Sequence, residues 1–194
     1  MRIVAGSARG RALRGPRSAS SIRPTADRVR ESIFNILGQW LDGQRVLDLY
    51  AGTGALGLEA VSRGAARAVL VDSGREAAEL CRQNAEELGF QGQVSVMAMP
   101  VERALQALRR AGERFDVVFA DPPYAAEVTA RTLEQAEPLL EPGGVCVMEH
   151  DKREEVPEAV GRLRRVDARA FGATRVALFR FLDPPEDGKD TGST

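Results

Sequence analysis

A short apolar run that leads into a glycine-rich turn constrains this chain more than any other feature. The run begins at Val46 and is followed by Gly52-x-Gly54-x-x-Gly57, after which the sequence becomes helical. The first two glycines permit a tight turn and a close approach of the backbone to a ligand, and Gly57 permits close packing of the helix on its strand. The free N–H groups of the helix N-terminus add a partial positive charge. This stretch predicts a nucleoside-cofactor site in a parallel α/β sheet.

The carboxylate of Asp48 argues against a dinucleotide, although the glycine spacing matches the dinucleotide fingerprint. Asp48 stands near the C-terminal end of the predicted strand, four residues before Gly52. A carboxylate there would lie close to a bound pyrophosphate, and two like charges repel strongly in a low-dielectric cleft. A cofactor with a cationic amine or sulfonium fits this position better, and S-adenosylmethionine carries both. The alternative is that Asp48 only caps the turn.

Predicted strands and helices alternate from Arg45 onward, which favours a parallel sheet with helices on both faces. Strands are expected at 45–50, 68–72, 93–98, 115–120 and 143–149, and helices at 55–63, 75–88, 101–111, 127–139 and 153–160. Residues 163–182 fit a hairpin of two strands better than a helix. Residues 183–194 are polar and are expected to be disordered.

Asp72 ends the second predicted strand, 18 residues after Gly54. An acid at about this distance can accept hydrogen bonds from both ribose hydroxyls of a nucleoside. Taken alone, Asp72 could also be a surface turn residue. Together with the glycine turn, it is interpreted as a ribose ligand.

The fourth predicted strand runs directly into Asp121-Pro122-Pro123-Tyr124, at the same sheet edge as the glycine turn. The two prolines fix the backbone and remove N–H donors, which leaves an environment rich in acceptors. Asp121 adds a carboxylate, and Tyr124 adds a flat face for a base. This combination predicts a site for a planar exocyclic amine, which donates two hydrogen bonds. The alternative is a rigid proline turn with a packed tyrosine.

Basic residues are concentrated near the N-terminus of a chain whose net charge is −1. Residues 1–45 contain nine arginines, three acids and no lysine, so this segment carries +6 and the remainder −7. Because the guanidinium fork suits phosphate, we interpret residues 1–44 as a basic N-terminal extension that binds RNA. The candidate phosphate contacts are Arg9, Arg11, Arg23, Arg28 and Arg30. The alternative is a solvated, arginine-rich surface.

This extension is expected to contain two short strands within residues 2–13 and one helix. The helix is expected to follow Arg23-Pro24, with Thr25 as its cap. Its apolar face is expected to comprise Val29, Ile33, Ile36, Leu37 and Trp40. Arg28 and Arg30 fall off that face and are expected to project toward the ligand crevice.

Composition excludes several other classes of protein. No apolar run approaches the roughly 20 residues that a membrane span needs. Cys81 and Cys146 lie far apart, and with His150 as the one histidine they form no metal-ligand spacing. The sequence therefore predicts a cytoplasmic protein without a metal site, with one catalytic domain at 45–182.

The motifs at 48–54, at Asp72 and at 121–124 resemble those of class I S-adenosylmethionine-dependent methyltransferases that act on exocyclic amino groups. The whole chain resembles more specifically the bacterial 16S ribosomal RNA guanine-N2 methyltransferases of the D type. That resemblance includes residues 2–13, 23–37 and 171–179, and it covers about residues 2–182. It implies a Rossmann-like sheet of seven strands, mostly parallel, whose last strand runs antiparallel. It also implies a monomer that acts on an assembled or assembling small ribosomal subunit.

The resemblance implies roles for individual residues as well. The residues expected to bind S-adenosylmethionine are Asp48, Tyr50, Gly52, Thr53, Gly54, Asp72, Met99 and Val101. The residues expected to act on the amine are Asp121, Pro122, Pro123 and Tyr124. Many methyltransferases have an acid after the third strand, whereas this chain has Met97-Ala-Met-Pro-Val101, so contacts to the adenine there must be apolar or from the backbone.

Three rival functions remain at this stage. A DNA adenine or cytosine amino-methyltransferase would use the motif at 121–124 in the same way, but 194 residues leave no obvious domain for reading DNA sequence. A dinucleotide-dependent oxidoreductase is disfavoured by Asp48. An RNA-binding module without catalysis is disfavoured because the cofactor and amine motifs both look intact.

Overall fold

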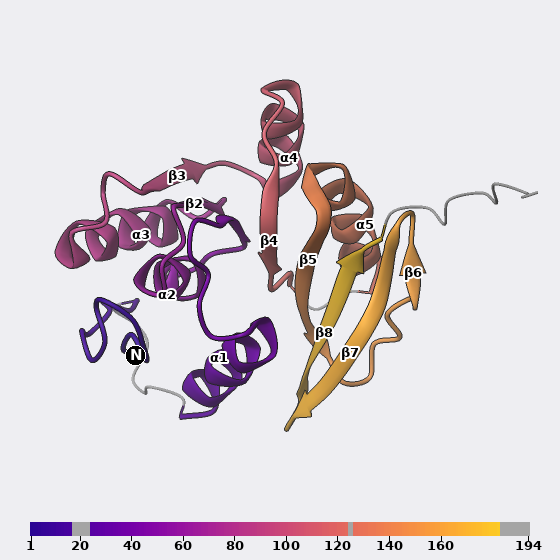
Figure 1. Ribbon diagram of the computed structural model, residues 1–194, viewed down its shortest axis with the longest axis horizontal. Helices are drawn as coiled ribbons and strands as arrows, with labels where there is room; N and C mark the ends of the chain where they lie inside the picture. Colours follow the sequence, from indigo (N-terminus) through magenta and orange to yellow (C-terminus); the bar gives the residue numbers. More distant parts are fainter. Residues whose placement is uncertain (17–23, 124–125, 183–194) are drawn as a thin grey trace, which may run out of the picture.

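A single mixed sheet forms the centre of the computed structural model, which describes residues 1–16, 24–123 and 126–182 (Figure 1). Within these residues the strand order is β3-β2-β1-β4-β5-β8-β7-β6. The strands are β1 (Arg45–Leu49), β2 (Arg67–Asp72), β3 (Val94–Ala98), β4 (Phe115–Ala120), β5 (Leu140–Asp151), β6 (Ala159–Val160), β7 (Leu163–Phe171) and β8 (Thr174–Phe181). The predicted tail at 183–194 lies outside the described residues.

The strand directions confirm the predicted fold class. The first five strands are parallel, because β1 pairs with β2 and β4, β2 pairs with β3, and β4 pairs with β5 in that sense. The last strand, β8, runs antiparallel to β5, and β7 and β6 continue the sheet in antiparallel pairs. The described sheet has eight strands rather than the expected seven, because the two-residue strand β6 is added at its edge.

The helix predicted at 153–160 is wrong. The chain turns at Lys152, whose N–H donates to the carbonyl of Ala173 at 2.9 Å, and then runs irregularly into β6. Pro157 explains the difference, because a proline in mid-helix removes a backbone donor and disfavours helical geometry at the residue before it.

The remaining predicted helices are present within a few residues of their expected ends. They are α1 (Pro24–Leu37), α2 (Ala55–Ser62), α3 (Arg75–Leu88), α4 (Val101–Arg110) and α5 (Ala126–Ala136), with the short 3-10 helix η1 (Glu137–Leu139) after α5. Helix α1 begins at Pro24, so Thr25 lies inside its first turn rather than before it. The expected place of Trp40 on the apolar face is also wrong, because α1 ends at Leu37 and Trp40 is 60% exposed beyond it.

Alternation along the strands divides the core into two layers. Val46 is buried with residues of α1, α2 and α3 on one face of the sheet, whereas Leu47 is buried with residues of α4 and α5 on the other. Because successive strand side chains point to opposite faces, every second residue of a central strand enters the same layer. The expected helices on both faces are therefore confirmed.

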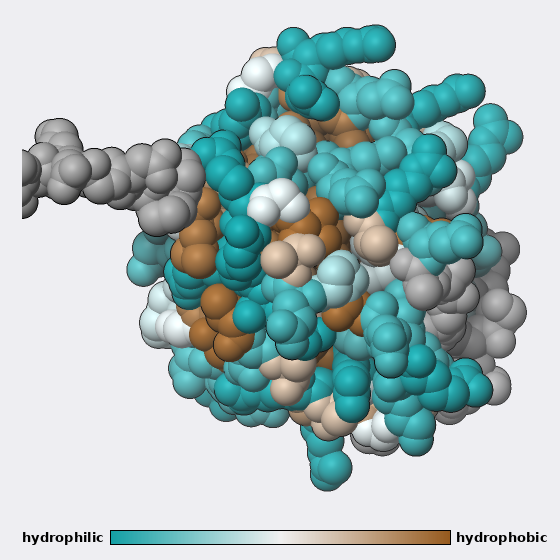
Figure 2. All heavy atoms as spheres, turned by 90° about the vertical axis from the view of Figure 1, so that its right-hand side faces the viewer, coloured by the Kyte–Doolittle hydropathy of each residue, from teal (hydrophilic) through white to brown (hydrophobic). Residues whose placement is uncertain are grey.

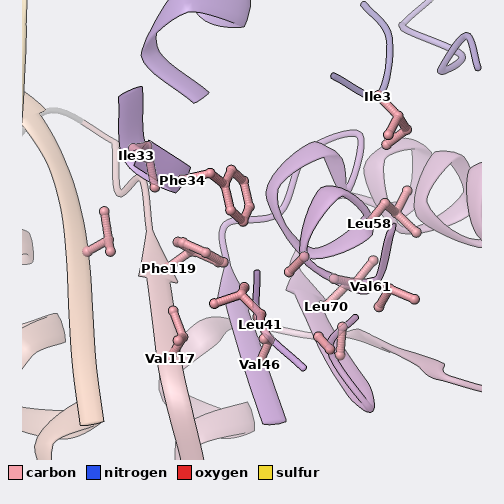
Figure 3. Packing of buried hydrophobic residues seen from close by; sticks show 14 of the residues in the cluster. Ile3, Ile33, Phe34, Leu41, Val46, Leu58, Val61, Leu70, Val117 and Phe119 are labelled. Carbon is pink, nitrogen blue, oxygen red and sulfur yellow. The ribbon is translucent and has the colours of Figure 1, made fainter. Parts of the chain in front are cut away.

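The N-terminal extension packs into the first of these layers. Ile3 lies beside α2, and Phe34 of α1 points toward Phe119 of β4, with 5.7 Å between the ring centroids (Figure 3). The two short strands expected within residues 2–13 are not present. These residues form a loop closed by one antiparallel bridge between Arg2 and Ala12. Residues 1–16 and α1 thus share their buried surface with the catalytic sheet.

The free edge of the sheet carries charged side chains. Strand β6 at this edge is two residues long, and most positions of β7 beside it are exposed or partly exposed. Figure 2 shows that this side of the molecule is mainly hydrophilic, with small, separate apolar patches. Short edge strands and charged side chains protect a sheet from pairing with other chains.

Candidate active site

Three glycines shape the turn between β1 and α2. Gly54 has φ 77° and is the N-cap of α2, a left-handed conformation that favours glycine. A Cβ on Gly57 would lie 2.2 Å from the Leu70 side chain, so the predicted close packing of helix on strand is confirmed. Gly52 also has a positive φ, of 57°, but a Cβ there would meet open space. The backbone at Gly52 is therefore accessible to a ligand.

Asp48 lies directly behind this turn, and its side chain is only 2% exposed. Its Oδ2 accepts a hydrogen bond from the N–H of Gly57 at 2.8 Å, which fixes the first turn of α2. Burial raises the pKa of Asp48 to about 7, because a charged carboxylate is disfavoured where water is excluded. A cationic ligand beside Asp48 would favour the ionised form. Asp48 therefore caps the turn, and its contact with a cationic ligand stays a prediction.

Asp72 at the end of β2 holds two neighbouring loops together. Its Oδ2 accepts from the N–H of Gly52 at 2.9 Å, and its Oδ1 accepts from the N–H of Gly74 at 2.8 Å. Each carboxylate oxygen has a second lone pair, so these bonds leave acceptor capacity for a ligand hydroxyl. The contact of Asp72 with a ribose stays a prediction.

Side chains from four adjacent strands meet in one cavity of about 460 Å³. Asp48 comes from β1, Asp121 follows β4, Glu149 comes from β5, and Thr174 begins β8. These four positions lie at the same end of the sheet, where its parallel strands have their carboxyl ends. The lining also includes Met1 and Arg30, so the N-terminal extension borders the cavity.

Strand register explains why the three carboxylates converge. Val117 and Phe119 of β4 and Val145 and Val147 of β5 are buried in the layer of α1 to α3. Two residues beyond each pair, the same alternation brings Asp121 and Glu149 to that face. Our sequence reasoning missed Glu149. The period of two in Val145-x-Val147-x-Glu149 could have identified it, but only with knowledge of which strand lies beside β4.

Burial is the main cause that raises the pKa of each of the three carboxyl groups. Burial, together with the nearby charges of Asp121 and Asp48, raises the pKa of Glu149 to about 8. Asp121 lies at the mouth of the cavity, where its side chain is open to solvent although partial desolvation raises its pKa. Pro122 is buried and Pro123 exposed, whereas Tyr124 lies outside the described residues.

Tyr50 and Thr53 line the same cavity. Tyr50 has φ 60°, an uncommon value for a residue with a side chain, and its hydroxyl hydrogen bonds to Thr132 Oγ1 at 3.0 Å. Thr53 Oγ1 lies 3.6 Å from the sulfur of Met1. The structure therefore brings both residues to the cavity, as expected of cofactor ligands.

The two candidates after β3 lie elsewhere. Val101, the first residue of α4, is 4% exposed, and both it and Met99 pack in the layer of α4 and α5. Neither residue lines the cavity described above. Their contacts with an adenine stay a prediction.

The comparison with known proteins identifies the family. A family model described as Conserved hypothetical protein 95 matches residues 1–180. The chain belongs to this family. The Putative rRNA methyltransferase YlbH of Bacillus subtilis is 39% identical to it over 182 residues, which cover 93% of this chain and 98% of the relative. The Ribosomal RNA small subunit methyltransferase D of Escherichia coli is 39% identical over 144 residues, which cover 74% of this chain and 68% of the relative.

The fold of this family is also known from solved structures. The structure of the Putative methyltransferase yhhF from Escherichia coli superposes with a TM-score of 0.82 at 30% identity, covering 95% of this chain and 99% of that one. The predicted resemblance to D-type rRNA methyltransferases and the predicted Rossmann-like methyltransferase fold are therefore confirmed.

The candidate RNA-binding arginines differ in how far their side chains are exposed. Arg9, Arg11 and Arg28 are exposed, although Arg11 donates to the carbonyl of Glu87, and Arg23 lies outside the described residues. Arg30 lines the cavity, as expected of a side chain directed toward the ligand crevice, but it is only 3% exposed.

The guanidinium of Arg30 is held inside the fold by several acceptors. It donates to the carbonyl of Arg2 at 2.6 Å and to Asp27 Oδ1 at 2.9 Å, and its Nε lies 3.6 Å from Glu59 Oε2. A guanidinium in this position cannot reach phosphates on the outer surface. It instead adds a positive charge to the cavity wall.

The described part of the chain contains neither a metal-binding cluster nor a membrane-spanning helix. Its histidine, cysteine and acidic residues form no group of three or more that could hold a metal ion. Among the same residues, no helix combines the length and the apolar character needed to cross a membrane.

Proposed function

We propose that this chain transfers a methyl group from S-adenosylmethionine to the exocyclic N2 of one guanine in 16S rRNA of the small ribosomal subunit. The observation that carries the proposal is the meeting of Asp48, Asp121 and the glycine turn in one cavity. The relatives named as rRNA methyltransferases support the substrate class. The protein is proposed to act as a monomer in the cytoplasm, where ribosomal subunits assemble.

The cofactor end of the cavity suits a ligand that carries positive charge and a nucleoside. When bound, S-adenosylmethionine supplies an electrophilic methyl group on a sulfonium. Asp48 offers a negative charge behind the glycine turn, and Gly52 offers an accessible backbone. Arg30 in the lining of the cavity can offset the carboxylate of the methionine part. Asp72 keeps free acceptor capacity for ribose hydroxyls.

The amine end of the cavity is proposed to orient guanine N2. The lone pair of N2 is delocalised into the guanine ring, so N2 is a poor nucleophile as long as it stays planar. Asp121 and the carbonyl of Pro122 each accept one N2–H bond, which favours a pyramidal nitrogen whose lone pair faces the methyl carbon. The N–C bond forms while the C–S bond breaks with its electron pair going to sulfur. The Asp121 carboxylate takes the released proton, directly or through water.

Most of the acceleration is expected from alignment and from exclusion of water. Positioning two reactants in line can supply several kcal/mol of the barrier, and preorganised charges add to it. The base cannot be reached inside a helical stack, so it must be unpaired or flipped into the cavity. We propose that Tyr124 stacks on it.

Methylation of small subunits tests this function. Subunits from a strain that lacks the corresponding methyltransferase are incubated with the full chain and methyl-labelled S-adenosylmethionine. Mass mapping of the 16S rRNA should find one N2-methylguanine. Methyl groups on adenine or cytosine, or in DNA offered at the same concentration, would assign the chain to the amino-methyltransferases of those bases instead.

A further inference from the structure

Glu149 is a carboxylate in the cavity for which the proposed chemistry has no use so far. Ala120 of β4 pairs with Met148 of β5, so the next residues along the two parallel strands are Asp121 and Glu149. Both line the cavity. The second carboxylate therefore lies beside the one that binds the amine.

No hydrogen-bond donor in the described part of the chain contacts the carboxyl group of Glu149. The groups that act on its carboxyl are Asp121 and Asp48, both of like charge, and no hydrogen bond or cation contributes. Keeping such a group partly buried costs stability, because the carboxylate loses hydrogen bonds to water and gains none from the protein. A ligand with an N–H aimed at Glu149 would remove this cost.

The Watson–Crick edge of guanine has such a donor in the required place. Its ring N1–H stands next to the exocyclic N2 amine, so two adjacent carboxylates can each accept one of these donors. In adenine and cytosine, the ring nitrogen next to the exocyclic amine has a lone pair and no hydrogen. A carboxylate that faces that nitrogen meets a second acceptor, which is repulsive.

We propose that Glu149 selects guanine by accepting a hydrogen bond from N1–H while Asp121 accepts one from N2–H. This inference rests on the proposed function and adds to it the determinant of base specificity. A cofactor sulfonium beside Asp48 favours the ionised form of Glu149, the form that only accepts. Sites that hydrogen bond a substrate group discriminate strongly against analogues that lack it, because the site's own polar group is then unpaired.

A base analogue tests the contact directly. 2-Aminopurine keeps the exocyclic N2 amine but has an unprotonated N1 and no O6. Small subunits are reconstituted from 16S rRNA that carries either guanine or 2-aminopurine at the position methylated by the full chain. Single-turnover rates at saturating S-adenosylmethionine are then compared for the two bases. The wild type should prefer guanine by a factor on the order of a hundred or more.

Three variants separate base reading from other roles. Glu149→Gln presents either an acceptor or a donor, so the preference for guanine should fall at least about tenfold. Asp121→Asn should slow both substrates and leave the preference unchanged, because N2 is present in both. Glu134→Gln makes the same chemical change on an exposed position of α5 and should alter neither rate nor preference.

The outcomes distinguish this inference from the proposed function. Absence of methylation on guanine subunits by the wild type would remove the proposed function itself. Equal rates of the wild type on guanine and 2-aminopurine would overturn the role of Glu149 while leaving the function intact. A Glu149→Gln enzyme that binds S-adenosylmethionine normally and keeps the full preference would overturn it as well.

Discussion

The carboxylate of Glu59 in α2 accepts a hydrogen bond from the backbone N–H of Val4 at 2.7 Å. Its other oxygen accepts from the N–H of Ala5 at 2.9 Å and from Arg63 Nε at 2.8 Å, and the residue is 0% exposed. These bonds join the start of the chain to the helix behind the glycine turn. The N-terminal extension is therefore part of the wall of the active site as well as a source of basic charge.

Removing this buried carboxylate should destabilise the whole protein. Glu59→Ala leaves Arg63, Arg30 and two N–H groups without their buried acceptor, so the free energy of unfolding should fall by about 3 to 5 kcal/mol. Urea denaturation measures the change. Glu134→Ala, on the exposed face of α5, should cost less than about 0.5 kcal/mol. Similar values for the two variants would mean that Glu59 does not hold the extension in place.

Asp121 is expected to act on the reaction and not on the cofactor. Asp121→Ala removes one of the two proposed acceptors for N2–H and the proposed proton acceptor. Methyl transfer in a single turnover at saturating cofactor should slow about a hundredfold or more. The affinity for S-adenosylmethionine, measured by calorimetry, should stay within a few fold. Wild-type speed in this variant would remove Asp121 from the mechanism.

Cofactor binding should release protons near neutral pH. Burial raises the pKa of Asp48 to about 7, so its carboxyl is partly protonated at pH 7. A sulfonium beside it lowers that pKa and expels the proton. Binding should therefore tighten as the pH rises from 6 to 8.

Calorimetry in two buffers measures this release. The apparent binding enthalpy at pH 7 should differ between phosphate and Tris by an amount that corresponds to the protons released, a fraction of one from Asp48 together with the contribution of Glu149. The Asp48→Asn variant should show weaker binding and a smaller difference between the buffers. A buffer-independent enthalpy in the wild type would mean that Asp48 does not meet the positive charge.

RNA contacts are best tested by single substitutions on the surface. Deleting residues 1–16 would remove the backbone partners of Glu59, so a truncated chain would confound folding with binding. Arg9→Gln and Arg28→Gln change exposed side chains. Each should lower the slope of log affinity against log salt by about 0.7 to 1 for binding to small subunits.

A matched substitution on the other face controls this experiment. Arg110→Gln changes an exposed arginine at the end of α4, in the layer away from the extension. Its salt slope should equal that of the wild type. If Arg9→Gln and Arg28→Gln behave like Arg110→Gln, these arginines are only a solvated surface.

Local features of the sequence were enough to predict the parallel half of the sheet and its cofactor turn. The apolar run at Val46, the glycines that follow it and the helix at 75–88 are each specified by neighbouring residues, and each is present as expected. Asp48 and Asp121 could be placed at one edge because parallel strands in this class of sheet end on the same side. The helix predicted at 153–160 is absent because Pro157 disfavours helical geometry in that segment.

Tertiary structure decided which side chains share the cavity and which are buried. Arg28 and Arg30 look alike in sequence, yet only Arg30 turns inward, because the fold brings the Arg2 carbonyl and the buried Glu59 carboxylate to it. Glu149 becomes a site residue because β5 pairs with β4 in a register that brings it beside Asp121. Strand order and register depend on contacts between segments far apart in the chain. The residue pattern within a single segment does not specify those contacts.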